Sequence, residues 1–504
     1  MEKKSVKIPE SLGTSLAENE AVIKRIMESC HDFIFRRITI PSIGRDAAVM
    51  YIDGLVKQDM IYDSALMPLV VLIKDVDADI TLEDISTQLV ASSEASVTSD
   101  FRSALDRMMH GDALILVDGL AGQLVMNARG WEKRSITEPQ TETVVRGPRE
   151  GFTETLRTNT ALLRRRIASP DLKIEMTQVG ERSRTNIAIA YMGELVRPGL
   201  VEEIKSRLAN IHIDLTNGSG TLDDFIKDSP YSAFETVYYS EKPDVIAGHI
   251  MEGRAAIIAD GTPFVLTAPM LFIENFQSAE DYLIGSAYGT FLRVIRIISF
   301  IISFLTPALY VALTTYHQAL IPAPLLFTMA AAAEGLPFPA LTETMVMLLI
   351  FEILKEAGIR LPKPVGQAVS IVGALVMGQA AIQAGIVGAP VVIVVALTGV
   401  ANFGVPTLAN SVSLIRWIFL LLAGFLGGFG VTLGVLALLV HLTSLRSFGV
   451  PHMAPFAPLI GSDLVDSVFR APAWKLTYRP ISIGSPNKRR AWFKRPDFRE
   501  DNLK

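Results

Sequence analysis

Polar side chains that stand inside long apolar segments are the first candidates for function. A charge at the centre of a bilayer costs about 2.5–3.5 kcal/mol, and such groups usually face the protein interior or a watery path. Six residues in the second half of the chain fit this description: Glu334, Glu343, Glu352, Gln379, Gln383 and Asn402. We treat them as candidate pore-lining or membrane-buried polar residues.

Two of the carboxylates, Glu343 and Glu352, cannot line one helix face together. Glu343 and Glu352 are nine residues apart, which on a helix of 3.6 residues per turn puts them on opposite faces. One interpretation places Glu334 at an interface and pairs Glu352 with a base such as Lys355. The alternative is that Glu343 faces an aqueous pathway.

The amides are open to two interpretations as well. Gln379 and Gln383 are four residues apart and share a helix face. They either bond to a neighbouring helix, which the small residues around them allow to pack closely, or line a pore. Asn402 precedes Gly404 and Pro406, where a helix would break, so it marks either a structural kink or an ion site.

Motifs for catalysis are missing from the sequence. No GxGxxG or GxxxxGK[ST] follows an expected strand, and HExxH, GxSxG and CxxC do not occur. We therefore expect no enzyme activity, no cofactor, no metal site and no nucleic-acid partner. The single cysteine, Cys30, excludes an internal disulfide, fits a reducing compartment and is expected to be an inert packed thiol.

The elements that must position the polar residues are membrane helices. Half of the 504 residues are hydrophobic, and the mean hydropathy is +0.35. Residues 364–415 and 417–445 carry no Asp, Glu, Lys or Arg and are separated only by Arg416. One crossing needs roughly 20 apolar residues. We predict an integral membrane protein with a helical polytopic membrane domain at 290–445, made of four to six helices including re-entrant segments.

Positive charge orients these helices, because cytoplasmic loops collect Lys and Arg. Arg293 and Arg296, the loop 355–363 and a basic tail at 446–504 should all be cytoplasmic, which requires an even number of crossings. Four crossings result if 391–401 is re-entrant. Six result if 414–441 splits at its glycines, among them Gly424 and Gly427.

The region before the membrane domain contains an internal repeat. YIDGLV at 51–56 recurs as YMGELV at 191–196, and MxGxAxIxxDG at 109–119 recurs at 251–261, with offsets of 140 and 142 residues. In each unit the Asp-Gly pair predicts a tight hairpin turn. The expected fold class is an α+β cytoplasmic region of two duplicated α/β subdomains, 31–135 and 150–285. A helical segment at 1–30 precedes them, and a linker at 136–149 joins them. The polar start of the chain has no signal peptide.

Several motifs resemble the A-subunit family of bacterial spore germinant receptors, the GerA family. They include GPREGF at 147–152, DGTPF at 260–264, PALYVALTT at 307–315, VGQAVSIVGAL at 365–375 and APAWK at 471–475. The similarity runs from about residue 30 to 490. One departure is SEKPD at 240–244, where the family more usually has Thr-Glu-Arg-Pro-Asp.

The resemblance implies a protein of the spore inner membrane with its amino- and carboxyl-terminal regions in the cytoplasm. It also implies a transporter-like B subunit and a lipoprotein C subunit as partners, homo-oligomerisation, and a monovalent-cation channel that triggers germination. A related paralogue encoded with the dipicolinic acid channel genes fits the same motifs. A non-conducting scaffold or signalling subunit is the main alternative. A secondary transporter is disfavoured, because the membrane halves show no clear inverted repeat.

Overall fold

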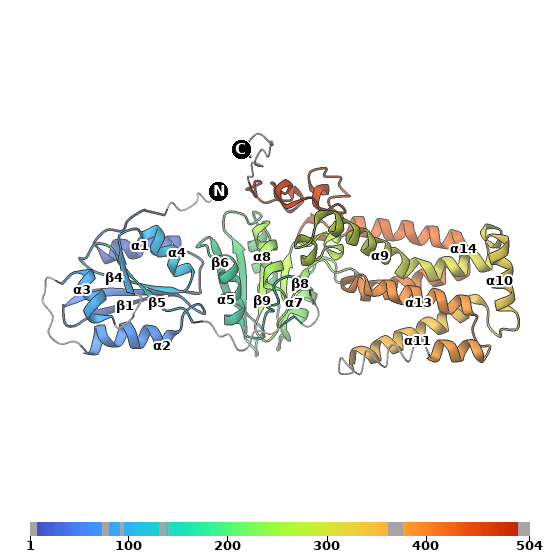
Figure 1. Cartoon of the computed structure of the whole chain (residues 1–504), viewed down its shortest axis with the longest axis horizontal. Helices are drawn as coiled ribbons and strands as arrows, with labels where there is room; N and C mark the ends of the chain where they lie inside the picture. Colours follow the sequence, from blue (N-terminus) through green and yellow to red (C-terminus); the bar gives the residue numbers. More distant parts are fainter. Residues whose placement is uncertain are drawn as a thin grey trace, which may run out of the picture.

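Two α/β units and a helical region follow one another along the molecule (Figure 1). The computed structural model describes residues 8–72, 80–90, 95–130, 138–139, 142, 144, 146–360 and 376–491. The predicted amino-terminal segment, linker and basic tail are therefore described in part, and Lys363 lies outside the described residues.

The first unit is built on an antiparallel sheet with strand order β1-β2-β4-β5-β3. Its strands are β1 (Phe33–Ile40), β2 (Arg45–Ile52), β3 (Ala95–Thr98), β4 (Asp112–Val117) and β5 (Gln123–Asn127). Its α-helices are α1 (Leu16–Ile26), α2 (Gln58–Ile61), α3 (Leu82–Asp84) and α4 (Phe101–Met109). Along β2, Met50 packs into one core and Val49 into another. Both faces of the sheet are thus covered, which explains why the middles of its central strands are apolar on both sides.

The second unit repeats this strand order as β6-β7-β9-β10-β8. Its strands are β6 (Leu172–Val179), β7 (Thr185–Met192), β8 (Tyr238–Ser240), β9 (Ala255–Ala259) and β10 (Val265–Ala268). Its helices are α5 (Leu156–Arg166), α6 (Leu200–Ala209), α7 (Gly218–Ile226) and α8 (Pro243–Met251). Again the sheet has one core on each face.

The Asp-Gly pairs occupy equivalent places in the two units. Gly119 and Gly261 both have positive φ, as predicted. The turns are longer than the predicted two residues, because β4 ends at 117 and β5 begins at 123. The aspartate before each glycine instead caps a helix: Asp118 accepts from Leu16 N at 2.8 Å, and Asp260 accepts from Leu156 N at 2.9 Å.

A short strand pairing and a buried ion pair hold the units together. Ile174 in β6 exchanges backbone hydrogen bonds with Ser29 and His31 at 3.0 and 2.9 Å. Beside them the buried guanidinium of Arg164 donates to both oxygens of Asp32, at 2.7 and 2.9 Å. Cys30 lies in this interface, and burial raises the pKa of its thiol.

The helical region contains two helices long and apolar enough to cross a membrane, Ser286–Thr315 and Pro406–Ser444, within the part of the chain that the structure describes. Its long α-helices are α9 (Ser286–Thr315), α10 (Ala323–Ala333), α11 (Ala340–Arg360), α13 (Ala389–Phe403) and α14 (Ala409–Ser444), and residues 376–383 are also helical. Helices α9, α13 and α14 make up most of the packing between them.

Helix α14 reverses its direction at Gly427, whose φ of 60° and ψ of −142° are not helical. A straight helix of 36 residues would be about 54 Å long. Yet Ser411 near its start donates to Ala233 O, and His441 near its end bonds to the adjacent Ser232. The two arms, 409–426 and 428–444, therefore lie antiparallel. This geometry corresponds to the alternative in which the segment splits at its glycines, while the number of membrane crossings stays a prediction.

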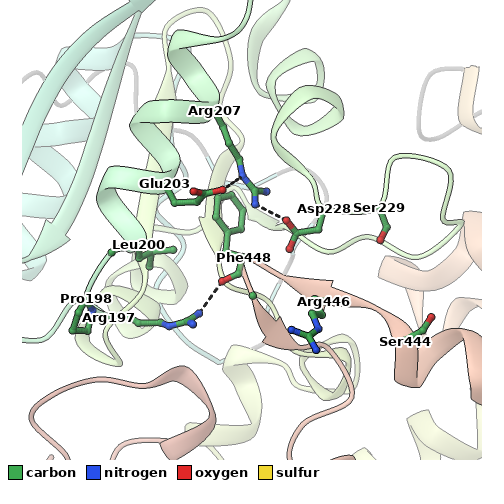
Figure 2. Close-up of a pocket in the computed structure, with 12 residues that line it drawn as sticks. Arg197, Pro198, Leu200, Glu203, Arg207, Asp228, Ser229, Ser444, Arg446 and Phe448 are labelled. Atoms are coloured by element: carbon green, nitrogen blue, oxygen red, sulfur yellow. Dashed lines mark hydrogen bonds and ion pairs between the residues drawn. The ribbon is translucent and has the colours of Figure 1, made fainter.

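The chain after α14 returns to the second unit and packs on it. It forms a small hairpin of β11 (Arg446–Ser447) and β12 (Val450–Pro451). Arg197 donates to Phe448 O at 2.8 Å (Figure 2), and Ser485 Oγ donates to Leu195 O at 2.7 Å. The described part of the predicted tail is thus integrated into the fold.

Candidate functional site in the helical region

A buried arginine anchors the main polar cluster of the helical region. Arg416, in the first arm of α14, is 0% exposed. Its NH1 lies 2.9 Å from Glu352 Oε1, and its Nε donates to Ser303 O at 2.8 Å. The cluster therefore joins α14 to α11 through a charge pair and to α9 through a backbone carbonyl.

Two further groups complete the partners of Glu352. Ser413 Oγ donates to Glu352 Oε1 at 2.9 Å, and Lys355 Nζ lies 3.4 Å from Glu352 Oε2. The predicted pairing with Lys355 is confirmed. The stronger partner, Arg416, was missed by sequence reasoning, although it is the one charge between two charge-free stretches and a charge in such a place needs a partner.

Glu343 has a different kind of partner. Its Oε2 accepts a hydrogen bond from Gly388 N at 3.1 Å, at the start of α13. Unpaired N–H groups at a helix amino terminus attract negative charge. Glu343 is only 4% exposed, so in the part of the chain that the structure describes it is buried at a helix end.

The amides divide into a buried and an exposed set. Asn402 is buried in α13, and its Oδ1 has no hydrogen-bond partner among the described residues. Gln379 and Gln383 are both exposed on the helix 376–383 and make no hydrogen bond within the described part of the chain. Glu334, at the end of α10, is exposed too. The structure thus brings none of these four into the Glu352 cluster.

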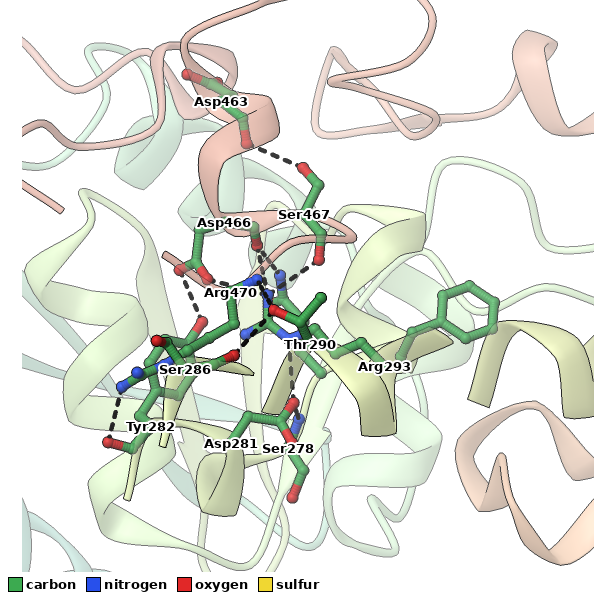
Figure 3. Close-up of polar contacts among 12 residues, drawn as sticks. Ser278, Asp281, Tyr282, Ser286, Thr290, Arg293, Asp463, Asp466, Ser467 and Arg470 are labelled. Carbon is green, nitrogen blue, oxygen red and sulfur yellow. Dashed lines mark hydrogen bonds and ion pairs between the residues drawn. The ribbon is translucent and has the colours of Figure 1, made fainter. Parts of the chain in front are cut away.

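A second charged cluster fastens the helical region to the second unit (Figure 3). Asp281, fully buried, accepts from Arg293 Nε at 3.1 Å and from Arg296 NH1 at 2.8 Å. Arg293 NH1 also lies 3.0 Å from Asp466 Oδ1. The cluster joins the start of α9 to the short helix Ala279–Tyr282 before it and to the chain that follows α14. Sequence reasoning had used Arg293 and Arg296 only as markers of orientation.

Burial sets the protonation of groups around this junction. Desolvation, and then the nearby Asp466 carboxylate, raise the pKa of Tyr282, whose hydroxyl donates to Asp466 Oδ2 at 2.8 Å. Desolvation followed by the charge of Arg254 lowers the pKa of His249, so its imidazole is neutral. Among the described residues no group of three His, Cys, Asp or Glu side chains is placed to hold a metal ion.

Comparisons with known proteins give a consistent picture. A sequence profile of the Bacillus/Clostridium GerA spore germination protein family matches residues 21–482. The chain is 43% identical to spore germination protein KA of Bacillus subtilis (strain 168), over 95% of this chain and 89% of that protein. It is 40% identical to the uncharacterized membrane protein YfkQ of the same organism, over 94% and 93% of the two chains.

Two further similarities come from other species. The chain is 36% identical to spore germination protein GerLA of Bacillus cereus, over 91% of this chain and 94% of that protein. Among solved structures, it matches the amino-terminal domain of the A subunit of the Bacillus megaterium spore germinant receptor GerK3, with 33% identity and a TM-score of 0.42. That match covers 53% of this chain and 99% of the other.

Proposed function

The chain belongs to the Bacillus/Clostridium GerA family of spore germination proteins, and from this premise we propose that it is a membrane-embedded A subunit of a nutrient germinant receptor. Several copies assemble into a channel for monovalent cations that opens early in germination. The protein lies in the spore inner membrane with both terminal regions in the cytoplasm. It acts with a transporter-like B subunit and a lipoprotein C subunit.

The exposed pair Gln379 and Gln383 carries the channel proposal. Both amides lie on one short apolar helix and have no hydrogen-bond partner among the described residues. An amide facing hydrocarbon without a partner costs several kcal/mol, which favours contact of this exposed face with water or another protein chain. A ring of copies that turns this face toward a shared axis provides both.

The buried charges support a path between copies and not through one copy. Glu352 is held by Arg416 and Lys355, and Glu343 is held at the start of α13. The charge of Glu352 is therefore balanced inside the chain, and the carboxylate of Glu343 accepts a hydrogen bond at a helix amino terminus. Exposed amides are therefore the better candidates for contact with a partly hydrated cation.

The reversal of α14 supports the cytoplasmic placement of both terminal regions. Because α14 leaves and returns to the same loop at Ser232 and Ala233, the chain after it packs on the second unit. Arg293, Arg296 and Arg446 lie at this end of the helical region. Cytoplasmic loops are enriched in Lys and Arg, so these residues favour a cytoplasmic position for this end. The matching strand orders, and the matching caps by Asp118 and Asp260, support the origin of the two units in one duplicated sequence.

A non-conducting scaffold is the second candidate, and one observation favours it. The Asp281 cluster binds α9, through Arg293 and Arg296, to the short helix Ala279–Tyr282 that follows the second unit. A buried pair of this kind suits an anchor that transmits force between a soluble region and a partner. In that case the exposed amides bind the B subunit instead of water.

Cation flux through purified protein in liposomes distinguishes the two candidates. We expect the parent to release K⁺ and a Gln379→Leu, Gln383→Leu double variant to lose most of that flux. The matched control is Gln318→Leu, which removes an exposed amide that donates to Thr314 O at the end of α9. The variants must form the same oligomer by size-exclusion chromatography. Flux that is equal in parent and double variant would contradict the channel assignment of these residues.

A further inference from the structure

A cavity of about 590 Å³ lies between the second unit and the chain that leaves α14 (Figure 2). One wall comes from α6 and the loops beside it. The other comes from the last residue of α14 and the hairpin that follows. The polar groups that line it are Arg197, Glu203, Arg207, Asp228, Ser229, Ser444 and Arg446.

The charges in the cavity are unequally matched. Arg207 is bound to both carboxylates, with its Nε 2.8 Å from Glu203 Oε1 and its NH2 in contact with Asp228, and it stacks 4.1 Å above the ring of Phe448. Both acids are therefore engaged by one base. Arg197 donates to the backbone oxygen of Phe448, and the guanidinium of Arg446 makes no ion pair or hydrogen bond among the described residues. The cavity, which Ser229 also lines, therefore has surplus positive charge.

The position of the cavity at the end of α14 indicates which environment surrounds Arg446. Ser444 ends α14, and Arg446 follows two residues later. On the last turns of that helix Val440 is 68% exposed, as expected for a side chain in lipid. Tyr231 is fully exposed next to Ser232, which bonds to His441. Exposed aromatic rings and arginines at the end of an apolar helix are typical of the level of lipid headgroups.

We propose that this cavity binds the phosphate group of an anionic phospholipid from the leaflet that faces the second unit. Arg446 supplies the charge, the hydroxyl of Ser229 donates a hydrogen bond, and the acyl chains run along Val440. Arg207 remains paired with Glu203 and Asp228 and lines the cavity without binding the phosphate. The inference rests on the proposed membrane placement but not on ion conduction. A bound lipid would tie α14 to the second unit at the point where the chain passes from one to the other.

The test uses the full-length protein in an uncharged detergent, titrated with phosphatidylglycerol, with the lipid-bound fraction read by native mass spectrometry. Arg446→Gln should weaken lipid binding about fivefold, since one Arg near an anionic surface contributes about 1 kcal/mol. Arg182→Gln is the matched control: it removes an exposed arginine that pairs with Asp214 outside the cavity and should leave binding unchanged. Thermal melting of both variants checks that they fold.

The possible results separate the lipid site from the membrane placement and from the channel. Equal lipid binding by the parent and Arg446→Gln would overturn the inference. So would tighter binding of inorganic phosphate than of phosphatidylglycerol by the parent, because the ligand would then be a free anion. Recovery of the parent in the aqueous phase of a detergent phase separation would overturn the membrane placement and the inference with it. Intact lipid binding without cation flux would count against the channel alone.

Discussion

Removing the charge of Glu352 should strongly destabilise the helical region. Its carboxylate is the only anionic partner of Arg416 among the described residues, and Arg416 is completely buried. In Glu352→Gln the guanidinium keeps its bond to Ser303 O but loses the neutralising charge. A second nitrogen of Arg416, NH2, already has no hydrogen-bond partner among the described residues. The variant therefore leaves a buried cation that little else compensates.

Glu352→Gln should lower the free energy of unfolding by about 3–5 kcal/mol, the range for breaking a buried ion pair by removing one partner. The side chain of Glu352 is 23% exposed, so solvent screens the pair slightly and the lower half of the range is expected. The control is Glu356→Gln on the same helix. Glu356 pairs with Arg360 where both side chains are largely exposed, so its loss should cost about 0–1 kcal/mol.

The measurement is reversible unfolding of the purified full-length protein in mixed micelles with increasing SDS. A double variant, Glu352→Gln with Arg416→Met, provides the decisive comparison. Removing both charges eliminates the buried cation, so the double variant should be more stable than Glu352→Gln alone. If Glu352→Gln and Glu356→Gln are equally stable, or if the two changes at 352 and 416 simply add, the assignment of a buried, coupled pair is wrong.

Three further predictions concern other parts of the chain. Asp32→Asn should lower the free energy of unfolding by about 3–5 kcal/mol, because it leaves the buried guanidinium of Arg164 without its charged partner between the two α/β units. A urea midpoint equal to the parent's would contradict this. Gly427→Ala should lower the melting temperature, because the φ of Gly427 is positive and a Cβ there would lie 2.8 Å from a ring carbon of Tyr316. The control is Gly248→Ala in α8, where a Cβ would have open space and the change should be neutral or stabilising. Equal melting temperatures for the two variants would refute the reversal of α14. Burial lowers the pKa of His452 to about 4, so between pH 6.5 and 4 the unfolded chain binds a proton that the folded chain does not. Stability should fall over that window by about 3 kcal/mol, and His452→Asn should remove that part of the slope; an unchanged pH profile in the variant would contradict it.

Features that depend on local chemistry were predictable from the sequence. The positive φ of Gly119 and Gly261 follows from the turn residues alone, because only glycine adopts that conformation without strain. The pairing of Glu352 with Lys355 follows from their spacing on one helix. The glycines of α14 also allowed a reversal, but a row of glycines is equally compatible with close packing, so both alternatives stood.

Features that depend on contacts between distant segments were not predictable. Arg416 and Glu352 are 64 residues apart and meet only because α11 and α14 pack together. Asp118 and Asp260 were assigned to tight turns, yet each caps a helix that begins about a hundred residues earlier in the sequence. The neighbouring sequence does not distinguish an aspartate that stabilises a turn from one that caps a distant helix, because both accept hydrogen bonds with the same carboxylate oxygens.

The central claim is that Gln379 and Gln383 face an aqueous path shared between copies. The most direct test replaces the buried Cys30 by serine and then introduces Gln379→Cys or Gln383→Cys, with Ile353→Cys, exposed on α11, as the lipid-facing control. A membrane-impermeant thiol reagent is applied to protein in liposomes while K⁺ flux is recorded. The account predicts that the reagent modifies the cysteines at 379 and 383 and blocks flux, and that Ile353→Cys does not react. Modification at 353 but not at 379 or 383, or modification of 379 and 383 that leaves the flux unchanged, would contradict it.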